Sequence, residues 1–226
     1  MAQTISTHIN ADLTQPAAAK VEEIEWIPSP QPGVSRRPLD RIGGEVARAT
    51  SIVRYDSDKA FPYHKHAMGE EYLVIDGVFS DNDGDFPSGT YVRNPPGSSH
   101  APHSRDGCII FVKLRQMQPQ GEPHVVVDTT TAEWEPAGSD GYSRVKLHEA
   151  ADGSEFVAME RLEAGASTGD RTLEGGEEIL LLDGDLEIEG DRFDAQAWIR
   201  RPAGSSYALS SHGGCRFWVK RNHLAS

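Results

Sequence analysis

The sequence predicts an all-β protein made of two jelly-roll barrels in tandem. Three observations predict this class. The 226 residues contain an internal repeat, their apolar segments are short and compact rather than spaced at helical intervals, and turns rich in the 22 glycines and 14 prolines separate these segments. Short strands at regular spacing with Gly and Pro between them are typical of β-sandwiches and barrels.

The repeat is visible as a constant offset between two copies. Identical residues recur 107 positions later in a gapless register from Arg54 to Lys113. The pairs include Arg54 and Arg161, Gly69 and Gly176, Glu70 and Glu177, Glu71 and Glu178, Gly77 and Gly184, Pro95 and Pro202, Cys108 and Cys215, and Lys113 and Lys220. From Trp26 to Leu39 the offset is 108, so one insertion or deletion aligns the whole length. A repeat this long is a whole small domain rather than a solenoid unit.

The repeat predicts three parts of the chain. We expect residues 1–20 to form an N-terminal lead, residues 21–118 a first barrel, and residues 119–226 a second barrel. The join falls in residues 118–123, which are rich in turn formers and poor in apolar residues.

Compact apolar runs in each copy predict the strands. Residues 72–75 and 179–182 are such runs, and the Asp-Gly pair after each predicts that a tight turn closes the strand. Residues 108–114 and 215–219 form a second pair of runs. The β-branched residues 125–127 predict a strand that opens the second copy.

Composition excludes several classes of function. Lys and Arg number 22 against 35 Asp and Glu, a formal net charge of −13. Neither nucleic acid nor an anionic membrane surface is therefore expected as a partner, because both are bound through basic clusters. No apolar run approaches the roughly 18 residues of a membrane span, and the first residues lack a signal-peptide pattern, so a cytoplasmic location is expected. Two cysteines are too few for a disulfide framework.

The residues that carry chemistry gather in the first copy. His64 and His66 are separated by one residue, so on a strand both point to the same face. Glu70 follows, and His100 comes after a Pro-x-Gly turn on what we expect to be another strand. Imidazoles and a carboxylate that converge can bind one divalent metal. A lone His-x-His would be better explained by two surface or half-buried loop histidines, and the later Pro-x-Gly-x-x-His segment is what favours a metal site.

These two segments resemble the two conserved motifs of the cupins. The first reads His64-x-His66-x-x-x-Glu70 with Gly77 after six further residues, and the second reads Gly89, five residues, then Pro95-x-Gly97-x-x-His100. The resemblance implies a tandem pair of RmlC-like double-stranded β-helix barrels, a bicupin. It also implies one metal held by His64, His66, Glu70 and His100. The chain departs from the motifs at Asp58 and Ser104, neither of which is a ligand position.

Longer segments are similar to the ChrR-type cupins, which include the C-terminal domain of the anti-sigma factor ChrR and some small dioxygenases. These segments are residues 70–74, 77–81 and 91–100. The anti-sigma factor carries a separate N-terminal helical domain with a His/Cys zinc site that grips the sigma factor. This chain has no cysteine before Cys108 and no comparable helical segment. Direct inhibition of a sigma factor by that route is therefore not expected.

The second copy has lost the site. At the offset of 107, His64, His66 and His100 become Arg171, Leu173 and Tyr207, and Glu177 remains. One carboxylate beside an arginine cannot hold a catalytic metal, so the second copy is expected to be structural or ligand-binding.

One question concerns which glutamate binds the metal. Because both glutamates persist in the second copy without the histidines, one of each pair can serve the barrel instead of a metal. Parity with the histidine pair and the cupin spacing favour Glu70 over Glu71.

Further side chains are weaker candidates for a place behind the ligands or in a pocket. They are Glu71, Tyr72, Tyr91, Arg93, His103 and Phe111. Aromatic residues on strands are more often plain core, and His103 is equally consistent with a solvated loop. Residues 81–85 predict a hairpin turn rather than a calcium loop, since no glutamate follows at the required distance.

The predicted ligand set suits zinc, iron(II), manganese or nickel, with zinc and iron the leading candidates. The first hypothesis is a metal- or small-ligand-binding sensor or regulatory protein of the ChrR-cupin type. The alternative is a non-haem iron dioxygenase acting on a small chelating ketone or diketone. A structural module without metal is the third. The expected partner is a small molecule, and a homodimer stays open because a duplicated barrel can mimic the pairing between chains.

Overall fold

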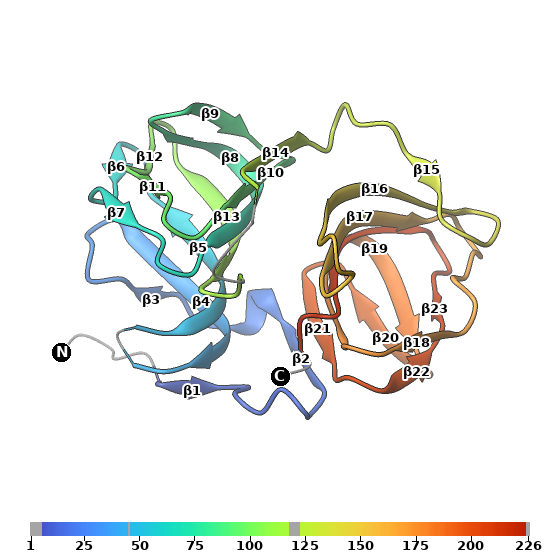
Figure 1. Cartoon of the computed structure of the whole chain (residues 1–226). Helices are drawn as coiled ribbons and strands as arrows, with labels where there is room; N and C mark the ends of the chain where they lie inside the picture. The colour runs from blue at the N-terminus through green and yellow to red at the C-terminus, as the bar shows by residue number, and fades with distance from the viewer. Residues whose placement is uncertain (1–5, 45, 118–122, 225–226) are drawn as a thin grey trace. The chain divides into compact units, whose positions relative to one another are not determined.

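The computed structural model describes residues 6–44, 46–117 and 123–224. These residues are strands, turns and loops with one short 3-10 turn, Val21–Glu23, and they contain no helix that is long and apolar enough to span a membrane. The all-β class and the tandem jelly-roll barrels are confirmed (Figure 1). The chain forms two compact units: the first takes in Ile24–Thr131 and the chain up to Ala11, and the second Asp12–Glu23 and Ala132–Ser226.

The first unit is built around one long antiparallel ladder. Its strands, in spatial order, are β1 (His8–Ile9), β4 (Val34–Ile42), β5 (Arg48–Tyr55), β13 (Cys108–Leu114), β8 (Glu70–Asp81), β10 (Thr90–Asn94) and β14 (Val125–Asp128). Shorter strands complete the barrel: β3 (Ile27–Pro28) on β4, β9 (Gly84–Pro87) and β12 (His103–Ser104) on β8, β6 (Lys59–Ala60) on β12, and β7 (His64–Lys65) on β11 (Ser99–His100).

From its second strand onward the second unit repeats the order of this ladder, and its first strand, β15 (Glu135–Pro136), is the equivalent of β3 rather than of β1. Its ladder runs β15, β16 (Tyr142–Glu149), β17 (Phe156–Leu162), β24 (Cys215–Arg221), β19 (Glu177–Ile188), β21 (Ala197–Arg201) and β2 (Ala17–Lys20). Its short strands are β20 (Asp191–Asp194) and β23 (Leu209–Ser210) on β19, and β18 (Arg171–Leu173) on β22 (Ser205–Tyr207). The repeat in the sequence is thus a repeat of the fold.

Two strands lie in the unit built from the other copy. β14, expected to open the second barrel, pairs with β10 of the first unit. β2, its equivalent in the first copy, pairs with β21 of the second unit. The predicted lead of residues 1–20 is therefore divided, since β1 joins the first unit and β2 the second. The predicted boundary between residues 118 and 119 lies outside the described residues.

The Asp-Gly pairs do not close strands as expected. Gly77 lies inside β8, next to a β-bulge opposite β13, and has a φ of 71°. A Cβ at Gly77 would lie 2.2 Å from the carbonyl oxygen of Gly107. Here β8 passes from pairing with β10 and β13 to pairing with β9 and β12. A positive φ is required at such a bulge as in a tight turn, which is why the sequence pattern predicted a turn.

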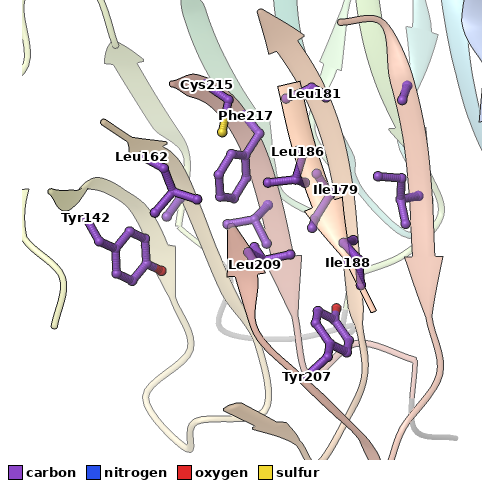
Figure 2. Close-up of a cluster of buried hydrophobic side chains, with 14 of the residues drawn as sticks. Tyr142, Leu162, Ile179, Leu181, Leu186, Ile188, Tyr207, Leu209, Cys215 and Phe217 are labelled. Atoms are coloured by element: carbon purple, nitrogen blue, oxygen red, sulfur yellow. The ribbon is translucent and has the colours of Figure 1, made fainter. Parts of the chain in front are cut away.

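The interiors of the two units differ. In the second unit, apolar side chains from several strands fill the interior, among them Leu162, Ile188, Leu209 and Phe217 (Figure 2). In the first unit an apolar cluster around Tyr72 and Phe79 leaves room for a cavity. Cys108 and Cys215 are both buried and free, as their positions at strand starts predicted.

Candidate metal centre

The four predicted ligands lie together. One potential ligand atom from each of His64, His66, Glu70 and His100 falls within 4.8 Å of the other three, and all but His64 are buried. Nε2 of His66 is 3.2 Å from Nε2 of His64. Oε2 of Glu70 is 3.4 Å from Nε2 of His66 and 3.3 Å from Nε2 of His100.

Backbone pairing positions these side chains. His64 on β7 lies directly opposite His100 on β11. The backbone N–H of His66 donates to Ser98, and the N–H of Gly97 donates back to the carbonyl of His66. Gly97 has a φ of 88°, so the Pro-x-Gly turn brings His100 back beside the His-x-His segment. Glu70 is the first residue of β8, after the turn that ends at Gly69.

The second nitrogen of each imidazole is hydrogen-bonded outside the cluster. Nδ1 of His64 donates to the carbonyl of Pro62 at 3.0 Å, and Nδ1 of His100 to Oδ2 of Asp81 at 2.8 Å. Nδ1 of His66 is 2.9 Å from the hydroxyl of Ser98. Since these carbonyl and carboxylate oxygens only accept, His64 and His100 carry their proton on Nδ1 and turn the Nε2 lone pair to the centre. Such outer partners are typical of metal-binding histidines.

Burial and charge act in opposite directions on these groups. Burial lowers the pKa of His66, and the charge of Glu70 offsets only part of that effect. Burial also lowers the pKa of His100, but the hydrogen bond to Asp81 and the charges of Glu70 and Asp81 outweigh it, so this pKa is raised. The centre therefore favours a positive charge beside His100, whether a proton or a metal ion supplies it.

Two buried atoms at the centre point to a missing partner. Oε2 of Glu70 and Nε2 of His100 are buried, and no hydrogen bond to either is formed by the described residues. Leaving a buried carboxylate oxygen and an imidazole nitrogen without partners is costly, and a cation between them would satisfy both. Three imidazole nitrogens and one carboxylate form a donor set that suits divalent transition metals. The residues present therefore fit such an ion.

Glu71 lies away from this cluster. Its carboxylate accepts hydrogen bonds from the Tyr91 hydroxyl at 2.7 Å and from Arg93 at 3.2 Å. Successive residues of a strand face opposite sides, so Glu70 and Glu71 diverge at the start of β8. The carboxylate in the cluster is that of Glu70. Glu71, Tyr91 and Arg93 form a buried group on the opposite face instead of lining the pocket, a correction to the expectation.

The remaining weak candidates also lie outside the cavity lining. Phe111 is buried on the face of β13 opposite Ile110 and Val112, which line the cavity. His103 is exposed on β12. Tyr72 packs against Phe79 with ring centroids 4.7 Å apart. Burial, then the charges of Glu70 and Asp81, raise the pKa of Tyr72, so a neutral hydroxyl lies near the ligands without facing the cavity.

A cavity of about 280 Å³ adjoins the four side chains, all of which line it. Its apolar wall includes Tyr55, Phe61 and Phe79. Neither Tyr55 nor Asp81 was predicted from the sequence as part of the site. Asp81 lies in the hairpin turn predicted for residues 81–85, and its carboxylate also accepts the hydrogen bond from His100. A comparison of the copies could have found Asp81, because the equivalent residue is Ile188, in a copy that has lost the histidines.

In the second unit a guanidinium takes the place of the ligands. Arg171 donates to both oxygens of Glu177, at 3.0 and 3.1 Å. Arg221 and the Tyr207 hydroxyl donate to the same carboxylate at 2.6 and 2.7 Å. Burial raises the pKa of Glu177, but the charges of Arg221 and Arg171 outweigh it and lower that pKa. Within the described residues, the four side chains of the first unit are the one group arranged to hold a metal.

Comparisons with known proteins agree with this architecture. The crystal structure of a protein from Nostoc punctiforme, described as a putative dioxygenase, matches with a TM-score of 0.76 at 14% sequence identity. The match covers 94% of this chain and 85% of that chain. Ylba of Escherichia coli has a TM-score of 0.71 at 13% identity, over 95% and 93%. The bacterial pirin YhhW of Escherichia coli, solved in complex with nickel(II), has a TM-score of 0.67 at 11% identity, over 92% and 98%. These identities show a shared fold alone.

The family is shown by the sequence itself. No curated protein is detectably similar over the chain. The ChrR cupin-like domain matches twice, at residues 14–118 and again at residues 122–225. Both copies, including the one without histidines, are therefore recognised as the same domain. The chain belongs to the ChrR cupin-like family, as a member with two barrels in tandem.

Proposed function

We propose that the protein binds a small molecule at a divalent metal ion held in its first unit, and acts as a metal-dependent sensor or regulatory protein. The observation that carries this proposal is that His64, His66, Glu70 and His100 all line one cavity. Structural metal sites are closed by protein ligands on every side, whereas sites that act on small molecules keep an open position. Because the four side chains here all line the cavity, an ion that accepts five or six ligands would keep a position on that side for a small molecule.

The surrounding residues hold this arrangement rigid. Asp81 and Ser98 fix the rings of His100 and His66 through their Nδ1 atoms. The ring of Phe61 packs edge-on against His64, with centroids 5.3 Å apart. These contacts keep the ligand atoms in place and exclude water from one side of the centre. A bound metal would supply a Lewis-acid centre with room for an oxygen-bearing ligand.

Binding rather than turnover is favoured by the rest of the lining. Among the described residues that line the cavity, the carboxylate and imidazole groups are those of the four ligands themselves. Tyr55 adds a hydroxyl whose pKa is raised by burial and then by the charge of Glu70, so it is a proton donor in hydrogen bonds rather than a base. Beside the four ligands, the described lining therefore offers Tyr55 and Lys65 but no further carboxylate or imidazole to serve as a general base.

A second candidate function is that of a non-haem iron dioxygenase acting on a small chelating ketone or diketone. The aromatic wall of Phe61 and Phe79 favours it, because oxygen chemistry needs a site from which water is excluded. We take zinc or iron as the leading metal for the sensor, iron for the dioxygenase, and the cytoplasm as the location for both.

The two functions separate in one experiment. Protein loaded with zinc or with iron(II), and protein stripped by a chelator, are titrated with acetylacetone by calorimetry, and oxygen uptake is followed with an electrode. Binding that requires metal, without oxygen uptake, supports the sensor. Oxygen uptake by the iron form that requires acetylacetone supports the dioxygenase. Equal binding by stripped and loaded protein contradicts both.

A further inference from the structure

The lining of the cavity has a charge opposite to that of the whole chain. Acidic residues outnumber basic ones by 35 to 22 in the sequence. Of the described charged side chains that line the cavity, the basic ones are Arg36, Arg41, Lys65 and Arg115, and the acidic one is the ligand Glu70. A divalent metal would add further positive charge. The cavity is therefore a local basic pocket in an acidic protein, and such pockets concentrate anions.

Arg36 is the most confined of these cations. It lies on β4 two residues from Val34, so both side chains point to the interior, whereas Arg37 points outward onto the ring of Trp26, 4.4 Å away. A β-bulge between Pro38 and Asp40 shifts the parity and turns Arg41 inward as well. Burial lowers the pKa of Arg36, which means that its charge is poorly solvated. No carboxylate of the described residues forms an ion pair with it.

In the second unit, the arginine at the equivalent position lies close to a buried carboxylate. Arg144 is the equivalent of Arg36, and each lies opposite the same ladder position on the next strand. That position holds Glu160 in the second unit, 3.8 Å from Arg144, and Val53 in the first. The first unit has kept the arginine and lacks its internal counter-ion.

The other three cations are confined to the copy that keeps the histidines. Arg41, Lys65 and Arg115 correspond to Glu149, Thr172 and Asn222 in the second copy. Three of the four lining cations therefore occur only in the copy that keeps the histidines, whereas the position of Arg36 holds an arginine in both copies and faces a carboxylate only in the second. The first copy thus combines the metal ligands with a basic lining, which indicates that both serve one ligand.

We propose that this ligand is a small molecule with a carboxylate group. The carboxylate group pairs with Arg36, while a further oxygen of the same molecule faces the metal position. This inference rests on the proposed function and adds the chemical class of the ligand. A guanidinium and a carboxylate form two parallel charge-assisted hydrogen bonds, a geometry that a neutral ketone cannot reproduce. The volume of about 280 Å³ limits the ligand to a small molecule.

The test compares charged ligands with uncharged isosteres. Metal-loaded protein is titrated with pyruvate and, for comparison, with diacetyl, in which an acetyl group replaces the carboxylate. Further carboxylates of two to six carbons are titrated in the same way, and each is compared with its uncharged amide or methyl ester. We expect at least one carboxylate to bind about tenfold tighter than its counterpart. In the Arg36→Met variant this preference disappears while the metal content stays the same. The Arg37→Met variant, altered at the neighbour that points outward, keeps the preference.

The outcomes distinguish this inference from the function beneath it. If no carboxylate in the series binds better than its uncharged counterpart, or if Arg36→Met keeps the preference, the inference is wrong even when binding requires metal. If carboxylates bind through Arg36 equally well after the metal is removed, the class of ligand stands and the metal-dependent function fails.

Discussion

At the scale of single residues, the centre depends on what lies behind the ligands as much as on the ligands. His100 is fixed between Glu70 on one side and Asp81 on the other, with Asp81 accepting from Nδ1 at 2.8 Å. This hydrogen bond sets the tautomer that turns Nε2 toward the metal position. Asp81 is buried with His100 and reaches it from the end of β8, eleven residues beyond Glu70.

Removing the Asp81 carboxylate weakens metal binding. In Asp81→Ala, Nδ1 of His100 loses its acceptor, and the affinity for metal is expected to fall about 10- to 100-fold. Competition with a chromophoric chelator measures the change. Asp83→Ala, in the same hairpin turn but exposed, is the matched control and keeps the affinity of the unaltered protein. Equal affinity in the two variants would show that Asp81 does not orient His100.

In the second copy, arginine side chains neutralise the glutamate at the position equivalent to Glu70. Arg171 and Arg221 neutralise Glu177, and Arg221 also pairs with Glu160. Removing one partner of a buried pair leaves the other uncompensated and is costly. The charge that a metal would supply in the first unit comes from arginine in the second.

The depressed pKa of Glu177 predicts a dependence of stability on acid. Its stabilising effect is complete above its ordinary pKa of 4.5 and is lost as the pH falls through the lower pKa of the folded state. The free energy of unfolding of Glu177→Gln should therefore be about 3 kcal/mol lower at pH 7, and the difference from the unaltered protein should shrink below about pH 4.5.

Urea unfolding followed by tryptophan fluorescence measures this difference, since Trp134, Trp198 and Trp218 all belong to the second unit. The exposed neighbour Glu174, changed to Gln, is the control and should behave as the unaltered protein does. A difference that stays constant between pH 7 and pH 3.5 would contradict the role assigned to Glu177.

Sequence reasoning reached the ligands but not the residues behind them, for a physical reason. His64, His66 and Glu70 are close in the chain, and the turn before His100 carries its own Pro and Gly signals. Asp81 and Arg36 depend on contacts across strands. The direction of Arg41 depends on a bulge beside Pro38, and a proline in a strand is equally compatible with a sheet edge.

At the scale of strands, one glycine decides the path of β8. The Asp-Gly pattern predicts a positive φ, and Gly77 has one, but both a hairpin turn and a bulge satisfy that requirement. The choice is made by the backbone just before β13, because the carbonyl oxygen of Gly107 lies 2.2 Å from where a Cβ of residue 77 would be. The positive φ of Gly77 was predictable from the sequence. Whether it occurs in a hairpin turn or in a bulge was not, because that depends on the neighbouring strand.

The strands β2 and β14 present the same difficulty. The repeat identifies them as equivalents, yet it cannot say which copy each one pairs with, because the edges of β10 and β21 offer the same backbone groups. The structure pairs each with the unit built from the other copy.

This pairing predicts crossed effects of strand disruption. Combining Ala18→Pro with Ala19→Pro removes backbone donors from β2, and amide exchange should accelerate at least about tenfold in β21 while β10 stays protected. Combining Val126→Pro with Val127→Pro in β14 is the matched variant and should expose β10 and spare β21. Hydrogen exchange read by mass spectrometry measures both. Faster exchange confined to β10 in the β2 variant would contradict the pairing.

At the scale of the whole molecule, two copies of one fold have taken different interiors. The first unit keeps a cavity with metal-binding chemistry and unpaired positive charge at Arg36. The second unit fills the equivalent space with apolar side chains (Figure 2), and arginines form an ion-pair network around Glu177. We therefore expect one metal ion per chain, although the fold occurs twice.

Elemental analysis of protein purified without a tag or added ions measures how many metal ions each chain holds. We expect about one transition-metal ion per chain. Most of it should be lost in His64→Ala and in His100→Ala, while circular dichroism shows that the fold survives. Arg171→Ala, the change at the position equivalent to His64, should leave the content unaltered. Two ions per chain, or an undiminished content in both histidine variants, would contradict this expectation.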